Sequence, residues 1–338
     1  MKLSTFLSAS IIFWRATETA STPLSPRSGD NVPKDYQKLK DYANLVSFAY
    51  CKELIPSKLG SNDSNCPILR CQEEEYKNIE VLNLFDFNDF GSIGSGYTGI
   101  DHQNKRIILA FRGTSTNRDW LANINVPFKK YNPLSNLQLK ADIECEGCKV
   151  HKGFYEFIEK HCVALIKQVA QLKQKYPDYQ LVVLGHSLGG VFALLSGMEF
   201  LLMDFQPLVI TYASPKVGNK AMVRFIDQLF ETSKVAQQSQ NDYDFNHGYI
   251  RVVHNYDMVP MLPPRELGYY HGGVEYHIEK SNLPHNPDSV HNRGQNHFSS
   301  NKDEGPVEKL ERIATSLVLV FTSKEHTQYF IPITGCKD

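Results

Sequence analysis

A serine between two glycines is the strongest chemical signal in the sequence. Gly185-His186-Ser187-Leu188-Gly189 has the pattern G-x-S-x-G, which presents a serine hydroxyl on a strained turn between a strand and a helix. An apolar run at residues 181–184 precedes the pattern, and an apolar helical segment from about 189 to 203 follows it. Although a five-residue pattern also recurs by chance, this context predicts that Ser187 is a nucleophile. The Leu188 N–H, at the start of the helix, is expected to bind the developing oxyanion.

A serine hydroxyl is a weak nucleophile at neutral pH, so it needs an acid and a base, which follow it along the chain in this arrangement. Asp257 fits the acid because it comes just after a predicted strand at residues 249–254, at the edge where parallel sheets collect catalytic groups. The rivals Asp204, Asp227 and Asp242 fall at a helix end, on a helix and in a polar segment. Those positions suit solvated charges, so Asp257 is preferred.

Chain order alone does not identify the base, because six histidines follow Asp257: His271, His277, His285, His291, His297 and His326. His285, His291 and His297 lie in an irregular polar stretch and are expected to be solvated at the surface. His326 lies between an apolar run at 317–321 and Tyr329-Phe330, near a cysteine that would hold the tail. A base requires rigid surroundings, and these surroundings favour His326.

The elements around these residues indicate an α/β fold. After a predicted hairpin at 96–101 and 106–111, strands and helices alternate, with helices expected at 153–174, 189–203 and 220–229 and strands at 181–184, 208–213 and 249–254. This alternation predicts a single domain with a largely parallel sheet and helices on both faces. Residues 233–248 and 281–305 are polar without periodicity and are expected to be irregular surface segments.

The charge balance excludes one large class of partners. The chain has 36 Lys and Arg residues against 37 Asp and Glu residues, so it lacks the basic character of nucleic-acid-binding proteins. A small neutral or apolar substrate is expected instead. Of its 338 residues, 41% are hydrophobic, which is enough for a large core. No metal or cofactor is expected.

The N-terminus has the layout of a secretory signal peptide. Lys2 is followed by an apolar stretch at residues 3–14 and by the small residues Ala20 and Ser21, and the stretch is too short to span a bilayer. We expect a signal peptide over 1–21, a flexible lead-in over 22–33 and one domain over 34–338; a disordered or buried extension is the alternative. The sequon Asn62-Asp63-Ser64 predicts a glycan on Asn62.

The cysteines fit an oxidising compartment. Their spacing allows two small loops and one long bridge, which would join Cys66 to Cys71, Cys145 to Cys148 and Cys51 to Cys336. Cys162, inside an apolar helical pattern, would stay unpaired. For the C-x-x-C of Cys145 and Cys148, a redox-active pair or half of a zinc site is the alternative, although no second C-x-x-C follows.

Taken together, these residues resemble the fungal class 3 lipases, a family of secreted triacylglycerol lipases with a feruloyl esterase branch. The similarity begins near residue 40 and is carried by AFRGT at 110–114, CEGCKVHKGF at 145–154, LGHSLGG at 184–190, TYASPKVGN at 211–219, RVVHNYDMVPMLPP at 251–264, HGGVEY at 271–276 and HTQYF at 326–330. The resemblance implies an α/β-hydrolase fold with a short lid after the oxyanion strand.

The resemblance also implies roles for individual residues. The family places its base in an H-x-x-Y-F segment about ten residues before a terminal cysteine, which His326 fits and His297, followed by Phe-Ser-Ser, does not. The same three disulfides are implied. Thr114 would be the second oxyanion donor. Residues 116–123 correspond to the lid, with Trp120 and Leu121 on its apolar side; an ordinary amphipathic turn is the alternative.

Three features depart from the family pattern: the polar insertion at 233–248, the longer stretch before His326, and His277 at a position that is usually tryptophan. The expected protein is a secreted, monomeric serine ester hydrolase that acts on glycerides through an acyl-serine intermediate, in transient contact with a membrane or emulsion surface. An extracellular location is expected, with the cell wall or vacuole as alternatives. The rival functions are an esterase for soluble or feruloyl-type esters, an acyltransferase and a non-catalytic lipid-binding protein.

Overall fold

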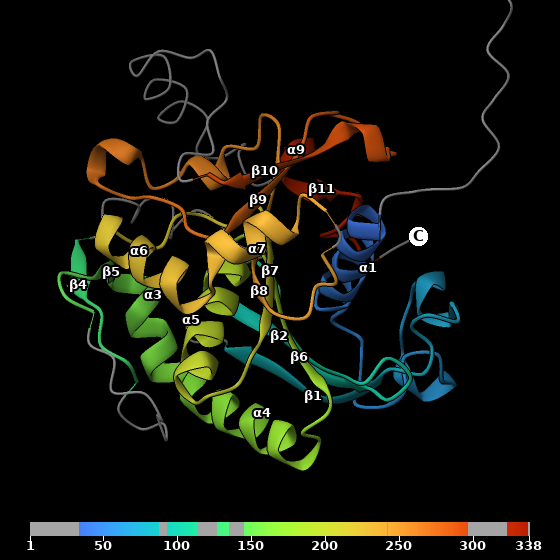
Figure 1. Cartoon of the computed structure of the whole chain (residues 1–338). Helices are drawn as coiled ribbons and strands as arrows, with labels where there is room; N and C mark the ends of the chain where they lie inside the picture. Colours follow the sequence, from blue (N-terminus) through green and yellow to red (C-terminus); the bar gives the residue numbers. More distant parts are fainter. Residues whose placement is uncertain are drawn as a thin grey trace, which may run out of the picture. The chain divides into compact units, whose positions relative to one another are not determined.

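An eight-stranded sheet forms the centre of the structure (Figure 1). This computed structural model describes residues 34–87, 93–113, 127–134, 145–241, 243–296 and 323–336. The strand order is β1 (Glu80–Phe87), β2 (Ile93–Asp101), β3 (Arg106–Phe111), β6 (Gln180–His186), β7 (Leu208–Tyr212), β8 (Gly248–His254), β9 (Val274–Ile278) and β10 (Val290–Gln295). The pairs from β3 to β9 are parallel, whereas β1, β2 and β10 pair antiparallel at the two edges. The predicted largely parallel sheet is confirmed.

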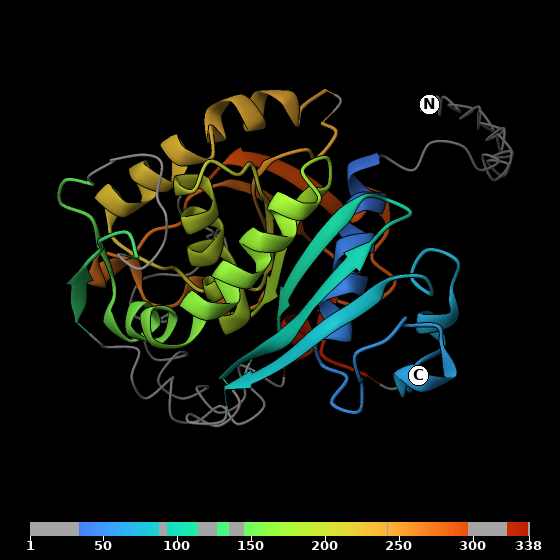
Figure 2. The same cartoon turned by 90° about the horizontal axis from the view of Figure 1, so that it is seen from below.

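Helices cover both faces of this sheet, because alternate residues of its buried strands enter two separate apolar cores. One core includes residues of α1 (Lys34–Phe48) and α7 (Thr232–Gln238); the other includes residues of α3 (Lys152–Phe157), α4 (Val163–Lys175), α5 (Leu188–Leu202) and α6 (Lys220–Leu229). Figure 2 shows α1 in blue and the green helices α4 and α5 on opposite sides of the strands. Within the described ranges, no helix is long and apolar enough to cross a membrane.

Smaller elements complete the described structure. A π-helical segment, Ile158–Cys162, joins α3 to α4. Two short strand pairs, β4 (Phe128–Lys130) with β5 (Lys149–His151) and β11 (Gln328–Tyr329) with β12 (Ile331–Pro332), lie outside the main sheet, as does helix α9 (Lys324–Thr327). The predicted hairpin and the predicted alternation of strands and helices are confirmed, whereas β1, β9 and β10 are additional strands that the sequence does not predict.

Two stretches that the sequence predicts to be irregular contain regular structure. Within residues 233–248, α7 buries Val235, and Tyr243 and Phe245 enter the core that contains α1. Within 281–305, β10 pairs with β9 and extends the sheet. The predictions are wrong for residues 233–238 and 290–295, because elements of six or seven residues are too short for hydrophobic periodicity to reveal them.

Three disulfides join Cys51 to Cys336, Cys66 to Cys71 and Cys145 to Cys148. These are the expected pairs, so Cys145 and Cys148 form a disulfide rather than half of a zinc site. Cys162 is a buried free thiol. The bridge from Cys51 spans 285 residues of sequence and anchors the chain ten residues beyond His326 (336 minus 326).

A buried carboxyl group lies on α5, twelve residues after Ser187 (199 minus 187). Glu199 is 2% exposed and accepts hydrogen bonds from the Tyr131 hydroxyl at 2.9 Å and from the Leu134 N–H at 3.1 Å. Burial raises its pKa to about 7, against the opposing effect of these two hydrogen bonds. Glu199 thereby attaches the segment at residues 131–134 to α5, the helix that begins next to Ser187.

We predict that this group makes the free energy of unfolding fall as the pH rises. The native carboxyl, with a pKa of about 7, binds more protons than the unfolded one, with an ordinary value of 4.5, so stability is lost between these two values. Between pH 5 and pH 8 the loss should be about 2–3 kcal/mol. Glu199→Gln should remove this part of the pH dependence. Urea unfolding of both proteins at the two pH values measures it, and equal pH dependences would contradict the prediction.

Candidate active site

The turn between β6 and α5 holds Ser187 in a strained backbone conformation. Its φ of 57° and ψ of −131° lie in a region that residues with side chains rarely adopt. A Cβ atom added at Gly185 would lie 2.2 Å from the Gly189 carbonyl oxygen, and one at Gly189 would lie 2.6 Å from the Arg112 carbonyl oxygen. Both positions therefore require glycine, and the serine follows directly after the carboxyl end of β6.

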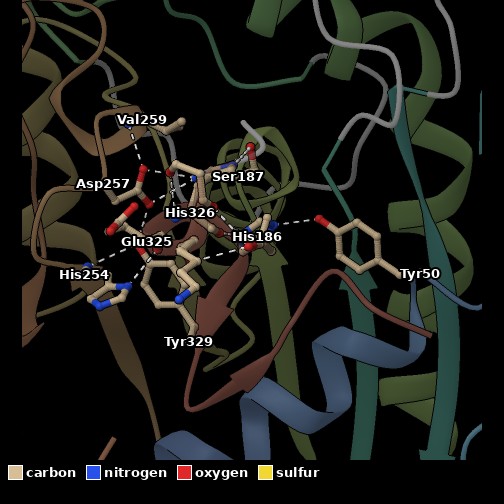
Figure 3. Close-up of polar contacts among 12 residues, drawn as sticks. Tyr50, His186, Ser187, His254, Asp257, Val259, Glu325, His326 and Tyr329 are labelled. Atoms are coloured by element: carbon tan, nitrogen blue, oxygen red, sulfur yellow. Dashed lines mark hydrogen bonds and ion pairs between the residues drawn. The ribbon is translucent and has the colours of Figure 1, made fainter. Parts of the chain in front are cut away.

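Three of the predicted residues meet at this edge of the sheet (Figure 3). The Nε2 atom of His326 lies 3.0 Å from Ser187 Oγ, and its Nδ1 atom lies 3.1 Å from both carboxylate oxygens of Asp257. Each of the three residues is at most 3% exposed. With a proton on Nδ1, the imidazole donates to the carboxylate and accepts from the serine hydroxyl. This arrangement can activate a serine nucleophile.

Hydrogen bonds keep Asp257 ionised in spite of its burial. The Val259 N–H donates to Oδ1 at 2.9 Å, and the Tyr329 hydroxyl donates to Oδ2 at 2.6 Å. Burial alone would raise the pKa of Asp257, but the electrostatic interaction with the His326 imidazole and the hydrogen bonds from His326, Tyr329 and Val259 together lower it below its ordinary value. The carboxylate can therefore orient the imidazole and stabilise its protonated form.

The turn that carries His326 is short, and polar contacts hold its backbone. The His326 N–H donates to Ser323 Oγ at 3.2 Å, which caps α9. On β8, the Nδ1 atom of His254 lies 2.8 Å from the Glu325 carbonyl oxygen, and its Nε2 atom lies 2.9 Å from the Lys280 carbonyl oxygen. The two carbonyl oxygens lie on opposite sides of the His254 ring. The base turn is thus attached to the strand that leads to Asp257.

Two of the rival acids belong to other parts of the fold. Asp227, on α6, accepts the Gly273 N–H at 2.8 Å and so connects that helix to the start of β9. Asp204 follows the end of α5 with a positive φ of 69°, and Asp242 falls outside the described residues. Among the residues that the structure describes, no group of three or more metal-binding side chains comes together.

One histidine prediction is wrong. His285, which the sequence predicts to be solvated, is 1% exposed. Its ring packs edge-on against His254, with 4.8 Å between ring centroids, and its Nδ1 atom accepts the Phe330 N–H. The polar local sequence does not reveal this burial, because the chain beyond His326 provides the contact. His291 is exposed, as expected.

The remaining predicted residues have different outcomes. Thr114, Trp120, Leu121 and His297 lie outside the described residues. Leu188 is the first residue of α5 and is 2% exposed.

Asn62 begins a short 3-10 helix, Asn62–Ser64, and its side chain is exposed.

Tyr329 and His254, which lie beside the cluster, receive no role from the sequence. Tyr329 supports the acid and His254 supports the base turn. The only sequence signal for Tyr329 is its fixed spacing after the base in the H-x-x-Y-F segment. For His254 the signal is a polar residue at the end of a buried strand, three positions before Asp257 (257 minus 254).

Comparison with known proteins agrees with this geometry. The sequence profile described as lipase (class 3) matches residues 108–267. A Saccharomyces cerevisiae protein, LIH1, whose lipase name is provisional, is 35% identical over 320 residues, which cover 90% of this chain and 95% of that protein. The chain belongs to the class 3 lipases. The resemblance noted from the motifs is therefore confirmed, and the chain is a lipase-type ester hydrolase by family.

Solved lipases share the fold over nearly their whole length. The Lip2 lipase of Yarrowia lipolytica is 27% identical, with a TM-score of 0.71 over 90% of this chain and 96% of that one. A mono- and diacylglycerol lipase of Aspergillus oryzae is 25% identical, with a TM-score of 0.66 over 90% of this chain and 100% of that one. Among sequences, secreted mono- and diacylglycerol lipase A of Penicillium cyclopium is 27% identical over 343 aligned positions, which cover 100% of this chain and 97% of that protein. The α/β-hydrolase fold is confirmed.

We predict that Tyr329→Phe destabilises the protein more than removal of another buried tyrosine hydroxyl. The Tyr329 hydroxyl donates to a charged carboxylate, a hydrogen bond worth about 1.5–3 kcal/mol, whereas a neutral hydrogen bond is worth about 0.5–1.5 kcal/mol. Tyr97→Phe is the matched control, because the buried Tyr97 hydroxyl donates to the Leu45 carbonyl oxygen at 2.9 Å. Urea unfolding at pH 7 compares the two variants. Equal losses would mean that Tyr329 does not stabilise an ionised Asp257.

Proposed function

We propose that this lipase hydrolyses glycerides through an acyl-Ser187 intermediate, with His326 as the general base and acid and Asp257 as the orienting acid. The observation that carries the proposal is the position of the His326 imidazole, 3.0 Å from Ser187 Oγ and 3.1 Å from Asp257. In the first step the serine proton moves to Nε2 while Oγ attacks the ester carbonyl. The protonated imidazole then donates that proton to the departing alcohol, and a water molecule releases the fatty acid by the same route.

Two N–H groups are proposed to bind the negative oxygen of the tetrahedral intermediates. One is that of Leu188, at the positive end of the α5 dipole. The other belongs to Thr114, whose hydroxyl would add a further hydrogen bond. Support for Thr114 comes from the preceding residue, Gly113. A Cβ atom added at Gly113 would lie 2.8 Å from Ser187 Cβ, so the segment that follows β3 runs directly beside the nucleophile.

Glycerides are the proposed substrates, because several relatives are named mono- and diacylglycerol lipases. Relatives named as secreted support the proposal of an extracellular enzyme. We further propose that residues 1–21 are cleaved and that the exposed Asn62 carries a glycan. The domain from 34 onward would act as a monomer in transient contact with a lipid surface. The proposal that Trp120 and Leu121 form the apolar side of a lid rests on the sequence alone.

We predict that Ser187→Ala and His326→Ala each reduce hydrolysis of p-nitrophenyl butyrate to near background, a loss of roughly 10⁴–10⁶-fold in kcat, because the three side chains act as a unit. Thermal unfolding should show that both variants remain folded. His297→Ala is the control and should keep wild-type activity. An inactive His297→Ala beside an active His326→Ala would identify the other histidine as the base.

We predict that the rate rises disproportionately when a triglyceride exceeds its solubility and forms an emulsion. In water an exposed Trp120 would cost about 25 cal/mol per Å² of apolar surface, whereas a lipid surface would accommodate the indole. Trp120→Ala should therefore weaken this rise more than it weakens hydrolysis of dissolved p-nitrophenyl butyrate. Rate-against-concentration curves for both proteins measure the effect. A smooth saturating curve, with equal losses on both substrates, would favour an esterase for soluble esters.

A further inference from the structure

A buried histidine contacts the backbone of the proposed base. His186 is the last residue of β6, next to Ser187, and it is 1% exposed. Its Nε2 atom lies 2.8 Å from the carbonyl oxygen of His326. A carbonyl oxygen only accepts hydrogen bonds, so Nε2 carries a proton and donates it. The residue before the nucleophile thus holds the peptide group of the base (Figure 3).

The other nitrogen of His186 contacts Tyr50. The Tyr50 hydroxyl oxygen lies 2.6 Å from His186 Nδ1 and accepts the Gly113 N–H at 2.8 Å. Burial lowers the pKa of His186 to about 3, so the ring is neutral near pH 7. A neutral ring with its proton on Nε2 accepts at Nδ1, and the Tyr50 hydroxyl therefore donates to it. Burial also raises the pKa of Tyr50, which keeps that proton on the phenol.

These contacts form one directed chain of hydrogen bonds: Gly113 N–H to Tyr50 Oη, Tyr50 O–H to His186 Nδ1, and His186 Nε2–H to the His326 carbonyl oxygen. Each group donates in the same direction, so the hydrogen bonds polarise and strengthen one another. One end of this hydrogen-bond chain lies at Gly113, two residues after β3 ends and one residue before Thr114. The other end lies on the backbone of His326.

We propose that Tyr50 and His186 are positioning residues that set the place of the His326 imidazole and of the end of β3 relative to Ser187. This inference rests on the proposed function of the Ser187 site. Neither side chain is proposed to touch substrate or to carry the transferred proton. Their effect is on geometry, and a misplacement of about 1 Å at such a site costs on the order of 100-fold in rate.

The short helix that carries His326 needs outside support, which the hydrogen-bond chain can give. The base must stay within hydrogen-bond distance of Ser187 Oγ, yet α9 is only four residues long and cannot fix its own orientation. Tyr50 is itself well anchored, because it follows α1 and precedes Cys51, which is bridged to Cys336. The hydrogen-bond chain thus connects the backbone of His326 to α1 and to the sheet, which restricts the movement of the proposed base.

The first test is Tyr50→Phe, which removes one hydroxyl and keeps the ring. On dissolved p-nitrophenyl butyrate we expect kcat to fall roughly 10–100-fold while KM changes less than about twofold, because substrate contacts are intact. Tyr97→Phe is the control, since that buried hydroxyl also donates one hydrogen bond, to the Leu45 carbonyl oxygen. Its kcat and KM should stay near wild type although its thermal stability falls by a similar amount. An unchanged kcat in Tyr50→Phe would overturn the proposal.

The second test separates the two sides of the His186 ring. In His186→Gln the amide N–H₂ can take the place of Nε2 and donate to the His326 carbonyl oxygen. In His186→Asn the shorter amide can take the place of Nδ1 and accept from Tyr50, but it leaves that carbonyl oxygen without its donor. We expect His186→Gln to keep at least about tenfold more kcat than His186→Asn. Equal activities per folded molecule would mean that the contact with His326 is only structural, and the proposal would be wrong.

A third measurement distinguishes failure of this inference from failure of the proposed function. Reaction of the wild-type protein with a p-nitrophenyl phosphonate should release one equivalent of nitrophenol, and Ser187→Ala should release none. A wild-type protein without Ser187-dependent reaction would overturn the proposed function and this inference together. A reactive wild type with an unchanged Tyr50→Phe would overturn the positioning role alone.

Discussion

The contact between His326 and Ser187 joins residues 139 positions apart in the chain, and the other features of the site serve to maintain it. The strained turn presents the serine from the end of β6. Glycine is required on both sides of it, because a Cβ atom at Gly185 or Gly189 would lie only 2.2 Å or 2.6 Å from a backbone carbonyl oxygen. Parallel strands bring Ser187 and Asp257 to one edge of the sheet. The base arrives from outside the sheet, so side-chain hydrogen bonds and a disulfide must hold it there.

Two buried carboxyl groups show how local contacts decide the charge of such a site. Glu199 and Asp257 are both 2% exposed. Glu199 has two neutral donors, and burial dominates, so its pKa rises to about 7. Asp257 has hydrogen bonds from Tyr329, Val259 and His326 and interacts electrostatically with the His326 imidazole, so its pKa falls despite burial. The same depth of burial therefore gives one group that titrates near neutrality and one that stays ionised beside the base.

Sequence patterns predict the parts of the site that depend on neighbours in the chain. Ser187, its glycines and Asp257 follow from a strand, a turn and the end of a second strand. The proposed base is different, because six histidines follow Asp257 and chain order does not choose among them. Its apolar surroundings favour His326, and the family motif H-x-x-Y-F agrees with that choice. His285 looks solvated by its polar neighbours but is buried by Phe330 and His254. Contacts between distant segments decide burial at such positions, and hydrophobic periodicity in the local sequence does not reveal these contacts.

The separation of 139 residues between Ser187 and the proposed base His326 has a consequence for the timing of biosynthesis. Chains grow at about 5–20 residues per second, so an interval of roughly 7–30 seconds separates the synthesis of Ser187 from that of His326. During that interval the nascent chain already contains Ser187 and, later, Asp257, but not the proposed base. By the proposed mechanism, ester cleavage cannot begin while the sheet is still being synthesised, and membranes near the ribosome meet a working lipase only after His326 has reached Ser187.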